Sequence, residues 1–115
     1  VEIHANPDWF KQILVNLVEN ALKYTPAHGT IALSYQVQEK QVEFVVHNTG
    51  EGISKEDSLK IFERFYRLDK ARSRAQGGSG LGLSIVKFII EILGGTIRVE
   101  SQPGQGVSFI FTLPR

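Results

Sequence analysis

The apolar residues of this chain change their spacing along its length, and this change of period constrains the fold more than any other feature. In residues 10–22 and 83–93 they recur every three or four positions, which predicts two helices with one apolar stripe each. Strands are predicted, mostly from alternation, at residues 31–37, 42–46, 96–100 and 107–112. Helices grouped over an antiparallel or mixed sheet predict an α+β two-layer sandwich.

Local signals set the expected boundaries of these elements. Asn6 is a candidate N-cap and Pro7 occupies the first helical position, while Pro26 should end the first helix near Tyr24. Two glycines at residues 94–95 should close the second long helix. Residues 1–4 can form a further short strand, and residues 59–65 a short helix and its exit.

Composition excludes several classes of protein. A chain of 115 residues suits one domain, and its net charge of +1 argues against bulk electrostatic binding to nucleic acid or an anionic membrane. Without cysteine there can be no disulfide or thiolate metal site, and no apolar run is long enough to span a bilayer. The absence of methionine predicts that residues 1–115 were excised from a longer chain.

A glycine cluster in residues 77–84 runs directly into the second long helix. Glycines leave backbone N–H groups open to an anion, and a helix start adds unpaired donors and the positive end of the helix dipole. The cluster therefore predicts a phosphate-binding site, here called the phosphate seat, although an ordinary flexible loop can have the same composition.

Asn16 and Asn20 lie four residues apart within an apolar segment of the first helix, so they share one side of it. Two such amides are either ordinary groups on the helix surface or part of a set of oxygen ligands that holds a hard cation together with phosphate oxygens. Lys23 and Tyr24, one turn further on, could add a positive charge and a hydroxyl.

Two other segments have both an ordinary and a functional interpretation. The segment after the second predicted strand contains Asn48, Gly50 and Gly52. It is either a simple turn, or a binding segment in which Asn48 is a polar group at the strand end and the glycines let a flat ring approach the backbone. Residues 66–79 are basic and without a clear period, either as a solvated face or as clamps for a polyphosphate. The three histidines, by contrast, show no metal-ligand spacing.

Together these segments resemble the catalytic ATP-binding domain of sensor histidine kinases, in the GHKL superfamily. Residues 16–24 resemble the N box, residues 48–53 the first glycine box, residues 61–67 the F box and residues 78–83 the second glycine box. The four motifs follow the family's order over most of the chain.

The resemblance implies a Bergerat-type fold: a mixed five-stranded sheet with three helices on one face and ATP held between the layers. It implies that Asn20, and secondly Asn16, bind Mg²⁺, and that these two residues and Lys23 are catalytic. Residues 66–79 would form a mobile lid. The implied ATP-binding residues are Asn16, Asn20, Lys23, Tyr24, Asn48, Gly50, Gly52, Ile53, Phe65, Arg67, Arg72, Arg74, Gly78, Gly80, Leu81, Gly82 and Leu83.

Two positions qualify the expected chemistry. Hydrolytic members of the superfamily carry a water-activating glutamate where this chain has Asn16, and an amide cannot act as a general base near neutral pH. Slow hydrolysis and transfer to a protein acceptor are therefore expected. The first glycine box normally begins with aspartate, and the neutral Asn48 predicts ATP binding weaker by about 10-fold.

The resemblance also implies partners outside these residues. The acceptor histidine lies on a helical dimerisation domain of the parent kinase, so this piece should bind nucleotide as a monomer and not phosphorylate itself. The parent would be a membrane-anchored sensor with this domain in the cytoplasm, signalling to a response regulator. The alternative is a degenerate regulatory module of the same fold, with weak or no kinase activity.

Overall fold

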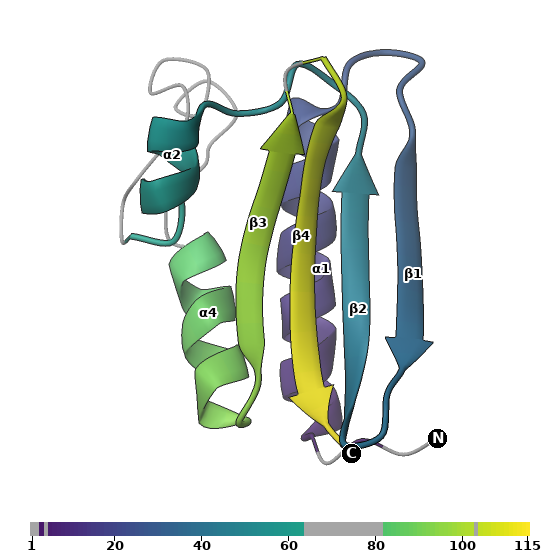
Figure 1. Cartoon of the computed structure of the whole chain (residues 1–115), viewed down its shortest axis with the longest axis vertical. Helices are drawn as coiled ribbons and strands as arrows, with labels where there is room; N and C mark the ends of the chain where they lie inside the picture. The colour runs from purple at the N-terminus through teal and green to yellow at the C-terminus, as the bar shows by residue number, and fades with distance from the viewer. Residues whose placement is uncertain (1–2, 4, 64–81, 103) are drawn as a thin grey trace.

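The computed structural model describes residues 3, 5–63, 82–102 and 104–115. Within them the chain forms α1 (Pro7–Tyr24), β1 (Ile31–Val37), β2 (Gln41–Asn48), α2 (Lys55–Lys60), α4 (Gly82–Ile92), β3 (Thr96–Gln102) and β4 (Gly106–Pro114). The strands make one sheet in the order β1-β2-β4-β3, with the helices on one of its faces (Figure 1). This arrangement confirms the predicted α+β two-layer fold.

The described sheet differs from the expected one in the number and direction of its strands. It has four strands rather than five, and every neighbouring pair is antiparallel. The fifth strand was expected at residues 1–4, of which only Ile3 is described, and Ile3 is not in a strand.

The predicted signals at the ends of α1 are confirmed. The Asn6 side chain accepts hydrogen bonds from the backbone N–H groups of Asp8 (2.8 Å) and Trp9 (3.4 Å), which caps the first turn. At the other end, Thr25 has an extended backbone ahead of Pro26, and its N–H donates to the Ala21 carbonyl at 2.9 Å. The last turn of α1, with Asn20 and Tyr24, is therefore fixed next to the β1 entry.

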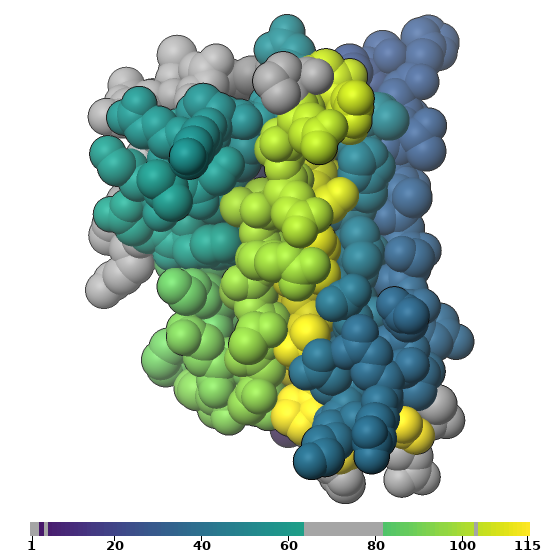
Figure 2. All heavy atoms as spheres, in the orientation of Figure 1, coloured from purple at the N-terminus to yellow at the C-terminus, as the bar shows by residue number. Residues whose placement is uncertain are grey.

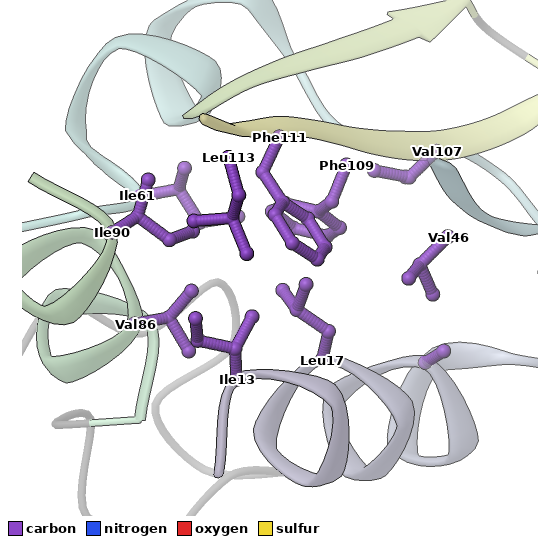
Figure 3. Packing of buried hydrophobic residues seen from close by; sticks show 11 residues of the cluster. Ile13, Leu17, Val46, Ile61, Val86, Ile90, Val107, Phe109, Phe111 and Leu113 are labelled. Carbon is purple, nitrogen blue, oxygen red and sulfur yellow. The ribbon is translucent and has the colours of Figure 1, made fainter. Parts of the chain in front are cut away.

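One core fills the space between the two layers (Figure 3). Ile13 and Leu17 of α1 and Val86 and Ile90 of α4 pack against the inward side chains of β2 and β4. The strands contribute Val46, Val107, Phe109, Phe111 and Leu113. Burial of these apolar side chains drives the association of the helices with the sheet.

The edge strand β1 departs from its expected half-buried pattern. Leu33 and Tyr35 are 59% and 70% exposed, although they share the inner face with Val46 and Phe44, their partners on β2. The reason is that α1 and α4 pack over β2, β4 and β3 and leave the inner face of β1 largely uncovered. The alternation predicted the strand correctly but could not predict which part of the sheet the helices cover.

The outward-facing positions of the four strands are mainly polar residues. Among the described residues, no helix lies over this face of the sheet (Figure 2). Arg98 of β3 lies 3.2 Å from a carboxylate oxygen of Glu100 and 3.9 Å from one of Glu43 on β2. His47 and Ser108 share a hydrogen bond of 2.7 Å. In the described part of the chain, no helix is long and apolar enough to cross a membrane.

Candidate functional site

A cavity of about 380 Å³ lies where the end of α1, the end of β2 and the segment leading into α2 meet the start of β4. Its walls bring together residues far apart in the sequence. They are Asn20, Tyr24, Pro26, Asn48, Glu51, Gly52, Ile53, Ser54, Asp57, Ile61, Val107 and Phe109. Five of the predicted site residues are in this set: Asn20, Tyr24, Asn48, Gly52 and Ile53.

The helix wall comes from the last turns of α1. Asn20 precedes the buried Ala21 on α1, and therefore lies at the edge of the buried side of this helix. Its amide side chain lines the cavity. Tyr24 follows one turn later and lines the same wall. Asn16 and Lys23 are half-buried on α1 but are not among the residues that line this cavity.

The sheet wall begins at Asn48, the last residue of β2. Its side chain is 3% exposed, and its Nδ2 donates a hydrogen bond to the Thr49 carbonyl at 3.1 Å. Among the described residues, Oδ1 of Asn48 accepts no hydrogen bond. Every fully buried side-chain polar atom in this part of the chain has a partner, so Oδ1 is not fully buried. The oxygen is therefore the part of this amide that remains open to the cavity.

Two glycines shape the segment that follows Asn48. Gly52 has a φ of +86°, and a Cβ there would lie 2.7 Å from Ser101 Oγ. Gly50 has a φ of +149°, and a Cβ there would lie 3.3 Å from the Tyr24 carbonyl oxygen. Both positions combine an unfavourable φ with a close neighbour, which explains why glycine occupies them. Gly50 does not itself line the cavity.

Ser101 holds this segment to the β3–β4 hairpin. The backbone N–H of Ile53 donates to Ser101 Oγ at 2.8 Å, and the same hydroxyl donates to the Gly106 carbonyl at 3.0 Å. Ser101 is not among the residues predicted from the sequence. The signal was its position in β3, where it continues the inward-facing row of Ile97 and Val99 as a polar residue.

The start of α2 adds polar residues to the cavity lining that were not predicted from the sequence. Ser54 caps α2 by accepting a hydrogen bond from the Asp57 N–H at 3.0 Å. The available signal was the spacing of Ser54 and Asp57, which is that of a capping box. Glu51 and Asp57 are the charged residues of the described lining, and both are acidic.

The part of the cavity lining that adjoins the core is apolar. Ile53, Ile61, Val107 and Phe109 line it, and the last three are buried core residues. Figure 3 shows Ile61, Val107 and Phe109 among the packed side chains between the layers. An apolar floor with one buried hydrogen-bonding group at its edge suits a flat heteroaromatic ring.

The predicted phosphate seat is described only at its end. Gly82 begins α4, and Leu83 packs against the core, but neither lines the cavity. A Cβ at Gly82 would meet nothing within 4 Å. Phe65, Arg67, Arg72, Arg74, Gly78, Gly80 and Leu81 lie outside the described residues.

The sequence matches the family model described as "Histidine kinase-, DNA gyrase B-, and HSP90-like ATPase" over residues 5–115. The chain belongs to this ATPase family. The match confirms the predicted resemblance and contains all four boxes.

Relatives within this ATPase family are named sensor kinases. The chain is 50% identical over 101 residues to the sensor-like histidine kinase SenX3 of Mycobacterium tuberculosis, covering 88% of this chain and 25% of that protein. It is 43% identical over 114 residues to the sensor histidine kinase WalK of Bacillus subtilis, covering 97% and 19%. The chain thus spans about a quarter or less of these relatives.

Solved histidine kinases share the fold. The mycobacterial sensor histidine kinase MprB superposes with a TM-score of 0.85 at 31% identity, over 97% of this chain and 76% of that one. Full-length ShkA in complex with AMPPNP gives a TM-score of 0.78 at 34% identity, over 92% and 21%. This chain is therefore an ATPase domain of the histidine-kinase type.

Proposed function

We propose that this domain binds ATP together with Mg²⁺ in the cavity and supplies the γ-phosphoryl group to a histidine on a separate helical dimerisation domain. The observation that carries the proposal is the meeting of Asn20 and Tyr24 with Asn48, Gly52 and Ile53 around one cavity. Membership of the ATPase family, and the solved complex of the related ShkA with AMPPNP, support ATP as the ligand.

The apolar end of the cavity would hold the adenine. Ile53, Ile61 and Phe109 offer surfaces against which a flat ring can pack. Asn48 Oδ1 would accept a hydrogen bond from the 6-amino group of the base. Gly50 and Gly52 would let the backbone approach the ring, as the resemblance implies.

Mg²⁺ fits the donor set of this site when phosphate oxygens complete its coordination. Mg²⁺ prefers oxygen ligands and commonly joins one or two protein groups to substrate phosphates. Asn20 would provide an amide oxygen, with Asn16 as a second candidate. The described residues contain no cluster of three or more acidic or histidine side chains that could hold a metal ion without phosphate.

The charge of the triphosphate needs further compensation, because the charged residues of the described lining, Glu51 and Asp57, are acidic. Lys23 and Arg67, Arg72 and Arg74 would supply positive charge. The glycine segment with Gly78, Gly80 and Gly82 would supply backbone N–H groups, and Phe65, Leu81 and Leu83 would flank it. Phosphoryl transfer depends chiefly on such positioning and charge neutralisation.

The acceptor and the later partners belong to the parent protein. Asn16 stands where hydrolytic relatives carry a glutamate, so transfer to a protein is favoured over hydrolysis. The proposed partners are the parent's dimerisation domain and, through it, a response regulator, with this domain in the cytoplasm. Residues 1–115 alone would be a monomeric domain that does not phosphorylate itself.

Calorimetric titration with ATP and Mg²⁺ tests the binding step. We expect saturable binding that requires Mg²⁺, and Asn20→Ala should weaken it by about tenfold because a metal ligand is lost. Gln12→Ala is the matched control, since it truncates an exposed amide on the same helix. Absence of ATP binding by the folded chain would contradict the proposal.

Asn48 favours one second candidate, a regulatory module that binds nucleotide weakly and transfers no phosphate. A neutral amide is a weaker acceptor than the carboxylate usual at this position. Adding the parent's dimerisation domain in trans with labelled ATP separates the two candidates. Phosphohistidine on the added domain supports the kinase, and ATP binding without transfer supports the regulatory module.

A further inference from the structure

The orientation of the Asn48 amide is fixed by one hydrogen bond. Nδ2 donates to the Thr49 carbonyl at 3.1 Å, and the side chain is buried at the end of β2. The reversed amide would place Oδ1 against that carbonyl oxygen, exchanging a hydrogen bond for the repulsion of two acceptors. The Thr49 carbonyl thus determines which atom of Asn48 meets a molecule in the cavity.

Thr49 is in turn clamped to Thr30, on the segment between α1 and β1. The Thr49 N–H donates to the Thr30 carbonyl at 3.0 Å, and Thr49 Oγ1 accepts from the Thr30 N–H at 2.8 Å. Gly29 lies so close that a Cβ on it would be 2.8 Å from Thr49 Oγ1. Only main-chain atoms of Thr30 take part, whereas Thr49 uses its hydroxyl.

We propose that Thr49 is a positioning residue for base specificity: through its clamp to Thr30 it holds Asn48 with Oδ1 toward the cavity, so the site selects purine nucleotides with a 6-amino group over those with a 6-oxo group. This inference rests on the proposed ATP function. It adds to it a residue that does not line the cavity and a reason for the choice of base.

The selection follows from hydrogen-bond chemistry. A 6-amino group donates to Oδ1, whereas a 6-oxo group would place a second acceptor against it. To accommodate the 6-oxo base, Asn48 would have to turn over and lose its bond to Thr49 while buried, which is unfavourable. A carboxylate presents an acceptor oxygen in either orientation. An asparagine amide presents a donor instead of an acceptor when it turns over, so its orientation must be controlled.

ATP and ITP form a matched pair of probes, since they differ at the 6-position and in the protonation of N1. Their dissociation constants, measured with Mg²⁺, give a selectivity ratio that a general loss of stability does not change. We expect the wild-type chain to prefer ATP by about tenfold or more. Equal affinities of the wild-type chain for ATP and ITP would overturn the inference without any variant.

Thr49→Val removes the hydroxyl of the clamp and leaves only the main-chain bond from Thr49 to Thr30. The Thr49 carbonyl is then held less firmly and Asn48 can turn over more easily, so the preference should fall to about threefold or less. Thr30→Val is the matched control: it deletes the same hydroxyl group from a residue that contributes only main-chain atoms, so the ratio should stay at its wild-type value. Thr49→Ser should restore the preference. An unchanged ratio in a folded Thr49→Val variant would overturn the role of Thr49.

The two proposals fail in different ways. If the folded chain binds neither ATP nor ITP, the proposed function fails and this inference falls with it. If ATP binds but the ratio does not respond to Thr49→Val, or responds equally to Thr30→Val, the proposed function stands and the clamp is rejected.

Discussion

The sheet wall of the cavity and its helix wall are held in different ways. Residues 48–53 are tied to other segments by hydrogen bonds, from Thr49 to Thr30 and from Ile53 to Ser101. Asn20 and Tyr24 instead project from a helix whose position depends on apolar packing of Ile13 and Leu17. Changes in the sheet wall should therefore alter both stability and binding, whereas a change of the Asn20 side chain should alter binding alone.

Gly106→Ala should give the largest effect on stability. Gly106 has a φ of +90°, and a Cβ there would collide with the carbonyl oxygen of Asn48, so β4 would have to move away from the sheet wall. We expect unfolding free energy to fall by about 3 kcal/mol, from backbone strain and overpacking together. Urea denaturation measures this loss.

Gly104→Ala is the matched control in the same hairpin. Gly104 also has a positive φ, +76°, but a Cβ there would meet nothing within 4 Å. Its cost should be the backbone strain alone, about 1 kcal/mol. Equal losses in the two variants would contradict the claim that the approach of Gly106 to Asn48 shapes this wall.

Ser101→Ala should reduce stability less but also affect binding. It deprives the Ile53 N–H of its acceptor and the Gly106 carbonyl of a donor, at a cost of about 1–2 kcal/mol. ATP affinity should fall by about threefold as the segment loosens. Ser108→Ala removes the hydrogen bond with His47 on the outer face and should leave ATP affinity unchanged; a similar loss of affinity there would refute the local explanation.

Asn48→Asp separates the effect of charge from the effect of hydrogen bonding. The carboxylate adds a charged acceptor in the cavity but loses the bond from Nδ2 to the Thr49 carbonyl. We expect ATP to bind about tenfold more tightly while unfolding free energy falls by about 1 kcal/mol. Calorimetry and denaturation measure the two effects, and equal ATP affinities would reject the importance of the charge.

Sequence alone predicted most of the fold because its signals are local. The Asn6 cap, Pro26 and the alternation in residues 96–100 each act through neighbours in the chain. The exposure of Leu33 and Tyr35 was not predictable in this way, because it depends on which strands the helices cover.

The candidate site was predictable to the extent that its residues belong to motifs. Asn20, Tyr24, Asn48, Gly52 and Ile53 lie in the boxes and line the cavity. Ser101 and Thr49 were missed as contributors because they act through hydrogen bonds to distant segments, which a single sequence does not reveal. The roles expected for Arg67, Arg72 and Arg74 stay predictions, since these residues lie outside the described ones.

Amide NMR of the isotope-labelled chain, titrated with ATP and Mg²⁺, tests most directly whether both walls face one nucleotide. The account predicts that the resonances of Asn20, Asn48 and Gly52 shift together with a single dissociation constant. Those of Ser34 and Arg98, on the outer face, should stay in place. Shifts confined to the outer face, or to one wall without the other, would contradict it.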